Sequence, residues 1–593
     1  MLTMNKIANT LKQYMPIFDW LPNYNKSNLS GDLSAGLTVG IMLIPQGMAY
    51  AMLAGLDPIH GLYAVTVPLL LYAIFGTSRQ LAVGPVAMVS LLTASSISTL
   101  NPSSPEEYLM LALTLAFLVG LIQFALGLFR FGFVVNFLSH PVINGFTSAA
   151  AIIIGLSQVK HLFRIKLPRT EHIQDTVVAI AQNISDIHWI TFGIGIVGII
   201  IIKYGKKIHK SLPTPLIAVV FGILAVTFLN LTESGVKVLG DVPSGLPTLS
   251  SPSFDMSVWS TLLPIALTIS LVGFAESYAV AKTIHGKHKN YKLDANQELI
   301  GLGMANFGAA FFKGYPVTGG FSRTAVNDQA GAKTALASII SVVLIVLTLL
   351  FFTGLFYNLP NAILAAVVLV AVSGLIDFKT PKTLWKNDKM DFLMLMATFI
   401  ATLTLGIETG IISGMILSLL AVIYKASRPH IAILAKVPGT KYYRNVERFT
   451  NLEKRDDVVV IRIDGPIYFA NVDFIKKKID RLVLSKKNTL RTIVLNMESV
   501  TSLDSSGAHE LDEWIRMWKT AGLNTSISGT RGPIRDILHT WGIIHSIGAD
   551  HVFTDDATAV DFFDNKINPE SIQELSPYAL QSEKKFDESS TGH

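Results

Sequence analysis

Two segments of the chain place glycine or proline where an apolar helix would otherwise continue. In GTSRQLAVGPVAMVSLL, an extended stretch precedes Gly84, Pro85 and Val86, and a new apolar run follows. In KGYPVTGGFSRTAVN, an extended stretch precedes Gly320, and a helix is expected to open at Phe321. Proline in a first turn and glycine at a tight entry are signals of a helix start. Both segments are therefore predicted to be short extended stretches that lead into new helices.

Helix starts of this kind, within a membrane, suit the binding of an anion. Extended backbone at membrane depth is tolerated only where protein or a polar cavity satisfies its hydrogen bonds. The first N–H groups of a helix have no partner within it, and its N-terminus carries the positive end of the helix dipole. Two such starts, one in each half of the chain, favour a central site between inverted repeats. For either segment alone, a proline kink filled by packing is an open alternative.

Two ionisable residues stand close to these features. Glu276 ends the uncharged run 256–275, and Arg323 lies just after the second predicted helix start. Ionisable groups inside a membrane are costly and usually have a function and a partner. We therefore expect both to belong to the site, although Glu276 could instead be an interfacial carboxylate.

Three uncharged polar residues are further candidates. Gln46 and Tyr50, in PQGMAY, are four positions apart, which places them on one helix face. Both donate hydrogen bonds without adding a charge. Ser322 stands beside Arg323 at the second helix start. Packing for Tyr50, a polar helix contact for Gln46 and a helix cap for Ser322 are the ordinary alternatives.

The elements that must position these residues are membrane spans. Of 593 residues, 50% are hydrophobic and only 15% are charged, which is far from the composition of a soluble globular protein. An apolar run of about twenty residues crosses the hydrocarbon core of a bilayer as a helix. Pro360 divides the uncharged run 334–376 into two spans, and Glu408 divides the run 392–424. Together with the shorter runs, we expect roughly fourteen crossings. The clearest runs are 33–56, 108–129, 131–159, 211–232 and 256–275.

Charges in the loops predict the orientation. Lysines fill three loops that share one side in this topology, and the positive-inside tendency makes that side cytoplasmic. Both termini are then cytoplasmic, in the inner or plasma membrane, and no removable signal peptide is predicted. A fourth basic loop, with Lys160, Arg164, Lys166 and Arg169, falls on the predicted outer side. The net charge of +6 needs no nucleic-acid partner, and the absence of cysteine excludes thiolate metal sites. We expect neither a metal site nor a cofactor.

A soluble domain is predicted beyond Tyr424, where charged residues become frequent. Strands and amphipathic helices alternate there, which indicates a small α/β layer. The predicted strands are 458–463, 492–497 and 524–528, and the predicted helices are 472–482 and 505–519. We divide the chain into an N-terminal cytoplasmic segment (1–30), a transmembrane transport domain (31–427), a linker (428–437), the soluble domain (438–565) and a disordered tail (566–593).

Several motifs together resemble the SulP sulfate permease family. They are GLTVGIMLIPQGMAYAMLAGLDPIHGLYA, GTSRQLAVGP, NQELIGLGMANFGAAFF and YPVTGGFSRTAVNDQAGAKT, and the soluble region, with DGPIYFAN and LDSSG, is similar to the STAS domain of that family. The resemblance implies an all-α polytopic membrane domain of two seven-span inverted repeats, with two half-helices preceded by short extended segments, and a cytoplasmic α/β STAS domain. It also implies core and gate subdomains, a homodimer and an elevator-like motion.

The resemblance also implies a site and a mechanism. Gln46, Tyr50, Gly84, Val86, Phe321, Ser322 and Arg323 would bind sulfate or a related oxyanion, and Glu276, near Arg323, would couple transport to protons. Arg323 would supply positive field, and a proton on Glu276 would remove its repulsion of a dianion. Family members that carry bicarbonate have aspartate and a sodium site in this region, so sodium coupling is less expected here. In related anti-sigma-factor antagonists the serine at the position of Ser505 is phosphorylated, although an ordinary helix cap explains that position equally well.

Proton-coupled sulfate uptake is the leading hypothesis, and several alternatives stay open. A bicarbonate or dicarboxylate carrier, sodium-coupled or not, would use similar donors. An anion channel, an exchanger or a voltage-driven motor like prestin would pass current without stoichiometric proton flux. A membrane-anchored signalling protein would leave the intramembrane polar residues unexplained. We do not expect an enzyme, because the sequence has no nucleophile elbow and no P-loop.

Overall fold

The computed structural model describes residues 14–133, 139–165, 173–208, 213–289 and 291–567. The chain divides between Leu419 and Leu420 into two compact units, a membrane unit and a soluble unit. Several predictions fall outside the described residues. These are the first part of the N-terminal segment (1–13), most of the predicted tail (568–593), and Lys166 and Arg169 of the fourth basic loop.

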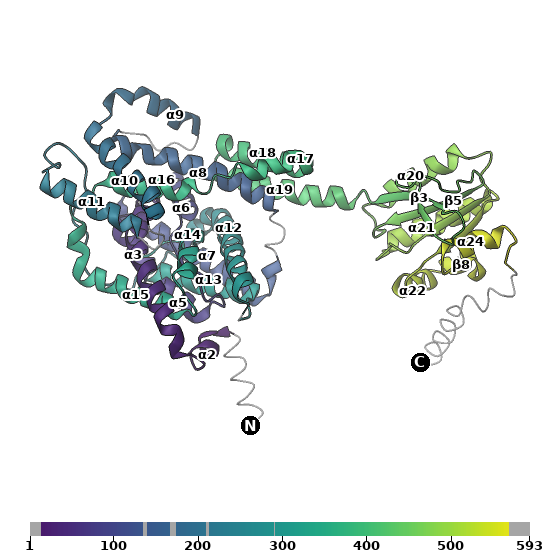
Figure 1. Ribbon diagram of the computed structural model, residues 1–593, viewed down its shortest axis with the longest axis horizontal. Helices are drawn as coiled ribbons and strands as arrows, with labels where there is room; N and C mark the ends of the chain where they lie inside the picture. The colour runs from purple at the N-terminus through teal and green to yellow at the C-terminus, as the bar shows by residue number, and fades with distance from the viewer. Residues whose placement is uncertain (1–13, 134–138, 166–172, 209–212, 290, 568–593) are drawn as a thin grey trace. The chain divides into compact units, whose positions relative to one another are not determined.

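The membrane unit is almost wholly helical, as its hydropathy predicts (Figure 1). Six of its described helices are long and apolar enough to cross a bilayer, and the described residues also form shorter apolar helices. The helical membrane fold is thus confirmed, whereas the count of roughly fourteen crossings stays a prediction. The helices are α2 (Ile17–Trp20), α3 (Leu29–Leu53), α4 (Pro58–Tyr63), α5 (Val67–Phe75), α6 (Ala87–Thr99), α7 (Pro105–Leu128), α8 (His140–Phe163), α9 (Ile173–Gln182), α10 (Trp189–Ile208), α11 (Thr214–Phe228), α12 (Met256–His288), α13 (Ala295–Phe311), α14 (Phe321–Gln329), α15 (Leu336–Leu347), α16 (Asn361–Ser373), α17 (Lys379–Asn387), α18 (Lys389–Leu405) and α19 (Ile407–Ala426).

The two predicted interruptions of long apolar runs can be compared with the helix ends. Pro360 is the N-cap residue of α16 and separates it from the preceding span, as predicted. The second interruption lies at Gly406 and not at Glu408, because α18 ends at Leu405 and α19 begins at Ile407. Gly406 has a φ of 94°, a left-handed conformation that glycine adopts without strain.

The helices of the membrane unit form two groups, and each group draws on both halves of the chain. In the first group α3 packs on α14 and α15, and α13 packs on α5 and α7. In the second group α8 packs on α16 and α18, and α10 packs on α11 and α16. Figure 1 shows α5, α7 and α13 together, with α8, α10 and α16 beside one another. The groups meet where α3 contacts α16 and α11, and where α6 contacts α8.

Two buried carboxylates hold loops of the first group in place. The Glu298 side chain accepts hydrogen bonds from the Tyr72 hydroxyl (2.6 Å), the Thr77 hydroxyl (2.6 Å) and two backbone N–H groups. The Asp32 side chain accepts from the Thr334 hydroxyl (2.7 Å) and from two backbone N–H groups that precede α15. A buried carboxylate is tolerated when several donors surround it. These contacts therefore fix the loops that flank the two extended segments.

The soluble unit contains a six-stranded sheet in the order β4-β3-β5-β6-β7-β8. Its strands are β3 (His430–Lys436), β4 (Tyr443–Asn445), β5 (Val458–Asp464), β6 (Thr492–Asn496), β7 (Asn524–Ser528) and β8 (Val552–Phe553). Strands β5 to β8 run parallel, and β3 is antiparallel to both β4 and β5. The segment 428–437, predicted to be a linker, therefore contains a strand of this sheet. Its apolar residues, such as Ile431 and Leu434, are buried.

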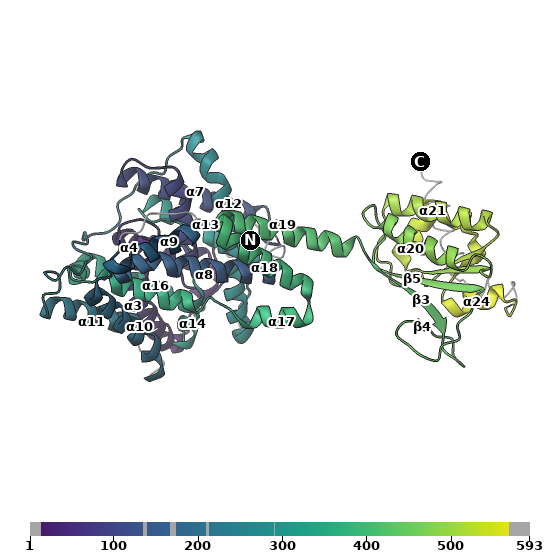
Figure 2. The same ribbon diagram turned by 90° about the horizontal axis from the view of Figure 1, so that it is seen from above.

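Helices cover both faces of this sheet (Figure 2). Helices α20 (Val472–Ser485), α21 (Ser505–Thr520), α22 (Gly532–Thr540) and α23 (Ile543–Ile547) pack over one face, and α24 (Asp556–Phe563) covers the other. The predicted strands and helices of this unit agree with β5, α20, β6, α21 and β7, and the small α/β fold is confirmed.

Candidate anion site

The two predicted extended segments meet inside the membrane unit as a pair of short strands. β1 (Val83–Gly84) and β2 (Thr318–Gly319) are antiparallel, with Val83 opposite Gly319 and Gly84 opposite Thr318. One more backbone bond, from the Gly320 N–H to the Ala82 carbonyl (3.1 Å), extends the contact. This pairing joins segments from the two halves of the chain and brings the starts of α6 and α14 together.

Neither of these helix starts is capped by a side chain. The N-cap residues are Val86 for α6 and Gly320 for α14, and neither offers a side-chain acceptor to the first turn. Val86 is buried, and the structure describes no cap hydrogen bond for either helix. Unpaired N–H groups and the positive helix ends therefore lie close to one another, an arrangement that favours a negatively charged ligand.

Surrounding side chains satisfy the extended backbone. The Ser277 hydroxyl accepts from the Gly319 N–H (2.7 Å), and the Thr318 hydroxyl donates to the Gly273 carbonyl (2.7 Å). The Asn306 side chain binds both the N–H (2.9 Å) and the carbonyl (3.0 Å) of Val317. Protein groups thus replace water around these strands, as irregular backbone at membrane depth requires.

Arg323 is buried beside the strand pair. Its side chain is 2% exposed, and its Nη1 donates to the Pro85 carbonyl at 2.5 Å. Its Nε and Nη2 are buried and have no hydrogen-bond partner among the described residues. A methyl group on Gly320 would lie only 2.8 Å from Nη2, so the glycine there leaves room for the guanidinium. The arginine thus links the two helix starts and keeps two donors available for a ligand.

Tyr50 and Glu276 lie near the same guanidinium, and Gln46 stands one helix turn before Tyr50 on α3. Gln46 and Tyr50 are buried on α3, and Oε1 of Gln46 has no hydrogen-bond partner in the described structure. Glu276, on α12, interacts electrostatically with Arg323 and Tyr50 and has one buried, unpartnered oxygen. The two charged residues form no direct ion pair within the described part of the chain. A polar group bound between them would supply the missing partners.

The first two residues of α14 are placed differently. The Phe321 side chain is 56% exposed, and Ser322 is also exposed. They are therefore not enclosed with Gln46, Tyr50 and Arg323. Their backbone N–H groups still belong to the uncapped first turn of α14. The start of α14 therefore belongs to the candidate site through its backbone and not through these two side chains.

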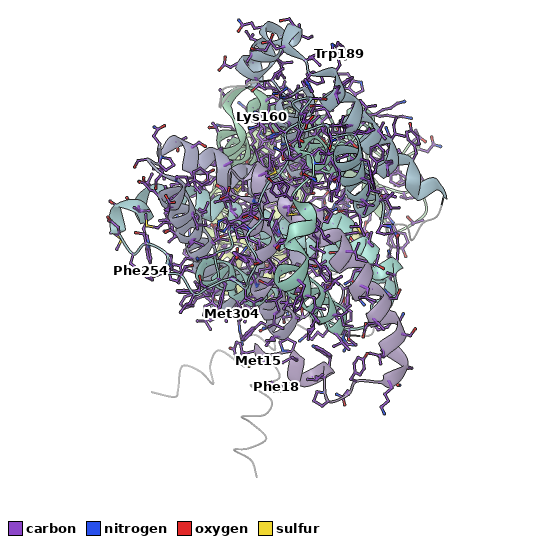
Figure 3. The ribbon with its side chains drawn as sticks, turned by 90° about the vertical axis from the view of Figure 1, so that its left-hand side faces the viewer. Met15, Phe18, Lys160, Trp189, Phe254 and Met304 are labelled. Carbon is purple, nitrogen blue, oxygen red and sulfur yellow. The ribbon has the colours of Figure 1, made fainter. Side chains whose placement is uncertain are left out.

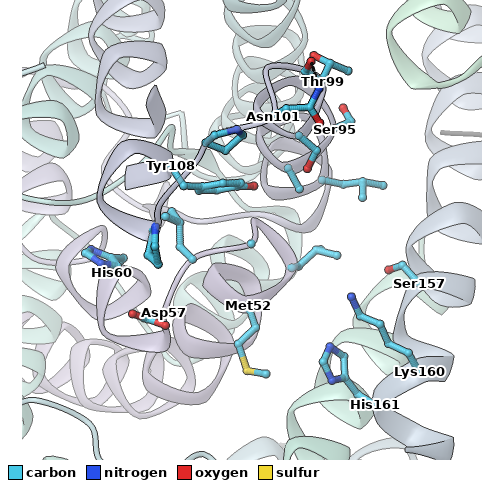
Figure 4. Close-up of a pocket in the computed structure, with 18 of the residues that line it drawn as sticks. Met52, Asp57, His60, Ser95, Thr99, Asn101, Tyr108, Ser157, Lys160 and His161 are labelled. Carbon is cyan, nitrogen blue, oxygen red and sulfur yellow. Dashed lines mark hydrogen bonds between the residues drawn. The ribbon is translucent and has the colours of Figure 1, made fainter. Parts of the chain in front are cut away.

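A cavity, which we call the vestibule, has a volume of about 920 Å³ and lies between the two helix groups (Figure 4). Lys160 and His161 lie side by side on the wall formed by α8, and Met52, Asp57 and His60 lie on the opposite wall. In Figure 3, Lys160 lies at the opposite end of the view from Met15 and Phe18 of the N-terminal segment. The vestibule thus lies on the other side of the unit from the N-terminal segment, which the sequence predicts to be cytoplasmic.

Ser505 lies at the start of α21 in the soluble unit. It is exposed, and the helix is capped by Asp504, whose side chain accepts from the Gly507 N–H at 2.7 Å. The cap is thus Asp504 and not Ser505, which leaves the serine hydroxyl open to solvent. Among the described residues, no group of three or more His, Asp or Glu side chains could hold a metal ion.

Sequence reasoning missed the residues that support the site. Asn306 and Ser277 hold the second extended segment, and Thr324 accepts from the Ala82 N–H (3.1 Å) to hold the first. The signal for Asn306 was present, because it is a polar residue in the middle of the apolar run that became α13. Serine and threonine give no such signal, because they commonly bond to their own helix.

Comparisons with known proteins identify the family of the chain. Residues 29–398 match the model of the sulfate permease family, and residues 450–559 match that of the STAS domain. The chain is 38% identical to "Sulfate transporter 4.1, chloroplastic" of Arabidopsis thaliana, over 92% of this chain and 82% of that protein. It is 33% identical to "High affinity sulfate transporter 2" of Stylosanthes hamata, over 94% of this chain and 87% of that protein.

Solved structures show the same fold. The murine Solute Carrier 26 family member A9 anion transporter, in an inward-facing state, superimposes with a TM-score of 0.86 at 27% identity, over 93% of this chain and 94% of that chain. The transmembrane domain of a cyanobacterial bicarbonate transporter superimposes with a TM-score of 0.59 at 23% identity. That match covers 67% of this chain and 98% of that chain, and it bears on the fold alone.

Proposed function

Because the chain belongs to the sulfate permease family and carries a STAS domain, we propose that it is a secondary active transporter that takes up sulfate together with protons. Anion transport is the function common to the relatives, whose names describe sulfate transporters and an anion transporter. The choice of sulfate rests on the names of these relatives and on the donors of the candidate site.

The observation that carries this proposal is the junction of two uncapped helix starts beside Arg323. A tetrahedral dianion accepts hydrogen bonds in several directions, and the proposed donors come from three elements: the helix start of α6, the helix start of α14 with Arg323, and Gln46 and Tyr50 on α3. Each neutral donor adds affinity without a fixed charge, and the guanidinium adds positive potential in a site of low dielectric. Backbone N–H groups from Phe321 and Ser322 complete the proposed set.

Glu276 is proposed to couple binding to protons. A carboxylate beside a bound dianion would repel it strongly where water is excluded. A proton on Glu276 removes that repulsion and lets the carboxyl group donate a hydrogen bond. Sulfate and the proton would then bind together and be released together, which is the requirement for symport.

The two helix groups suggest how the site could cross the membrane. The paired strands and Arg323 lie within the first group, and the second group meets it at the helix contacts α3–α16, α3–α11 and α6–α8. We propose that the first group, as a core, moves against the second, as a gate, in an elevator-type motion between inverted repeats. Transporters generally achieve alternating access by such rigid-body movement of one bundle against the other.

The basic residues of the vestibule are proposed to gather anions. Lys160 departs from the positive-inside tendency but lines the hollow at the predicted outer end. A positive mouth raises the local concentration of an anionic substrate. This role explains why basic residues lie on the predicted outer side, where the positive-inside tendency predicts few of them.

We propose a homodimer in the cytoplasmic membrane, surrounded by lipid, with both termini and the STAS domain in the cytoplasm. The STAS domain would support dimerisation or regulation, and exposed Ser505 is a possible phosphorylation site. In sealed right-side-out cells, tags placed after Met1 and after His593 are both expected to resist an added protease. They should become accessible only after permeabilisation, and cleavage of either tag in intact cells would contradict the orientation.

Labelled sulfate uptake into proteoliposomes tests the substrate. We expect selenate to compete strongly, because it is also a tetrahedral dianion, and bicarbonate and succinate to compete weakly. Stronger competition by bicarbonate or succinate would identify a different carrier. Sulfate current without stoichiometric proton movement would indicate a channel.

Removal of single donors tests the site. Gln46→Ala and Tyr50→Phe should each lower sulfate affinity about tenfold or more, because a hydrogen bond to a charged group contributes about 1.5–3 kcal/mol. Ser322→Ala should have a smaller effect, since its side chain is exposed. Tyr278→Phe, also on a membrane helix, serves as the matched control and should bind normally. Normal affinity in both the Gln46 and Tyr50 variants would remove these residues from the site.

A further inference from the structure

Another cavity, which we call the N-terminal pocket, lies between residues 14–20, the end of α7 and the segment that leads into α13. Its volume is about 640 Å³, and three basic side chains line it: Arg79, Arg130 and Lys292. Within the described part of the chain, none of these three forms an ion pair. The Arg79 guanidinium lies over the Tyr291 ring, 5.2 Å from its centre. The pocket thus combines positive charge with an aromatic wall.

Two carboxylates also line the N-terminal pocket, and they do not balance its charge. Asp294 is the N-cap residue of α13, and its side chain accepts from the N–H groups of Asn296 (2.9 Å) and Gln297 (3.1 Å). Asp19 is exposed on α2. The oxygen of Asp294 is thus engaged by the helix cap, and the three basic side chains still outnumber the two carboxylates of the pocket.

The wall of this pocket also contains a buried donor that has no partner among the described residues. Trp20 lines the pocket and is 5% exposed, with its ring packed near Ala73 and Ala335. Its Nε1 is buried and has no hydrogen-bond partner among the described residues. Indole nitrogen is only a donor, so an acceptor atom that reaches it from the pocket would satisfy it. Buried donors are normally paired, which makes this one informative.

The size of the pocket and its surroundings restrict the chemistry. Its volume is typical of sites for small organic ligands, and a bare tetrahedral oxyanion would fill only a small part of it. Leu128 lines the pocket, and two exposed phenylalanines are the sequence neighbours of lining residues: Phe18, next to Asp19, is 44% exposed, and Phe129, next to Leu128, is 71% exposed. An anion that carries an organic body fits both observations.

We propose that the N-terminal pocket binds a phosphate ester, with its oxygens held by Arg79, Arg130, Lys292 and the indole N–H of Trp20. Arginine and lysine are the usual partners of phosphate, and hydrogen bonds between ionised groups are the strong ones. The ester can come from the headgroup of an anionic membrane lipid or from a soluble metabolite. In either case the ligand ties the N-terminal segment to α7 and α13. The proposal concerns a site separate from the strand pair and does not depend on which anion is transported.

Binding to the full-length protein tests this proposal without a transport assay. In one arm, the protein is placed in nanodiscs of phosphatidylcholine with or without phosphatidylglycerol, and bound lipid is counted by native mass spectrometry. In the other arm, detergent-solubilised protein is titrated with glycerol 3-phosphate, which has the same phosphate ester without acyl chains. Thermal unfolding in each arm reports binding, because a ligand that binds only the folded state raises the unfolding temperature.

The variants separate the pocket from general charge. The pocket variant is a triple substitution that combines Arg79→Gln, Arg130→Gln and Lys292→Gln. Its affinity for the phosphate-ester probes should fall about tenfold or more, because several charge-assisted hydrogen bonds are lost. Lys26→Gln, Lys282→Gln and Lys333→Gln combined remove the same charge outside the pocket and should bind like wild type. Trp20→Phe keeps the packing and removes the donor, so it should weaken binding to a smaller extent.

The two arms identify the source of the ester. Binding of phosphatidylglycerol alone assigns the pocket to lipid headgroups, and binding of glycerol 3-phosphate as well assigns it to soluble esters too. The proposal is wrong if the pocket variant binds both probes like wild type. It is also wrong if the control variant loses binding to the same extent, or if wild type binds neither probe.

Discussion

Arg323→Gln is expected to lower sulfate affinity by about a hundredfold or more. The guanidinium has two buried donors that have no partner among the described residues. Each hydrogen bond to a charged group contributes about 1.5–3 kcal/mol, where about 1.4 kcal/mol corresponds to a factor of ten. The substitution also removes the only charge in the site that attracts the substrate in our proposal. Binding of labelled sulfate to the purified protein measures the effect.

Arg323→Lys is the matched control for charge. Lysine keeps the positive charge but not the planar fork that reaches two acceptors, so its affinity should lie between those of Arg323→Gln and wild type. Because Arg323 also donates to the Pro85 carbonyl, both variants should first be shown to be folded by size-exclusion chromatography and thermal unfolding. If folded Arg323→Gln binds sulfate like wild type, the arginine does not belong to the anion site.

Glu276→Gln is expected to abolish proton-driven accumulation of sulfate. Glutamine resembles the protonated carboxyl group, so the variant should still bind sulfate and exchange it across the membrane. The glutamine side chain cannot release a proton, so a pH gradient cannot drive sulfate accumulation through this residue. The assay is sulfate accumulation in proteoliposomes under an imposed pH gradient, with the membrane potential clamped and sodium absent. Wild type should accumulate more sulfate as the external pH falls.

Two further variants sharpen this test. Glu276→Asp keeps a carboxylate with a shorter reach and should retain part of the coupling. Glu233→Gln removes an exposed carboxylate of the membrane unit and should transport like wild type. Proton coupling through Glu276 is contradicted if Glu276→Gln accumulates sulfate normally, or if wild type accumulates it only when sodium is supplied.

Features that depend on a few neighbouring residues, such as helix starts and helix breaks, could be predicted from the sequence alone. Pro360 and the helix-start signals before α6 and α14 were readable because backbone geometry follows directly from glycine and proline. The alternation of strands and helices predicted β5 to β7 with only small shifts at their ends. The break between α18 and α19 was predicted at Glu408 and not at Gly406, because a charged residue in an apolar run is a more visible signal than a glycine.

The assembly of the site could not be predicted from the residues alone. The pairing of Val83 with Gly319 depends on the packing of many intervening helices. The same holds for Arg323, whose bond to the Pro85 carbonyl links the two halves of the chain. Strand β3 was missed because a short run between a membrane helix and a polar loop has no clear periodicity until its partner β5 is known. Contacts between distant segments are decided by the fold and not by local pattern.

The pairing of β1 with β2 also has a consequence for biosynthesis. The N-terminal segment of the pair leaves the ribosome long before its partner, because all helices from α6 to α13 lie between them in the sequence. Until Thr318 and Gly319 arrive, the backbone of Val83 and Gly84 has no strand to bond with, and bare polar backbone is not tolerated in lipid. The first half of the protein must therefore wait in the insertion machinery, or in a water-filled environment, until the second half is made. A truncated chain that ends before β2 should be recognised as unfinished and degraded, even when each of its helices can enter the bilayer.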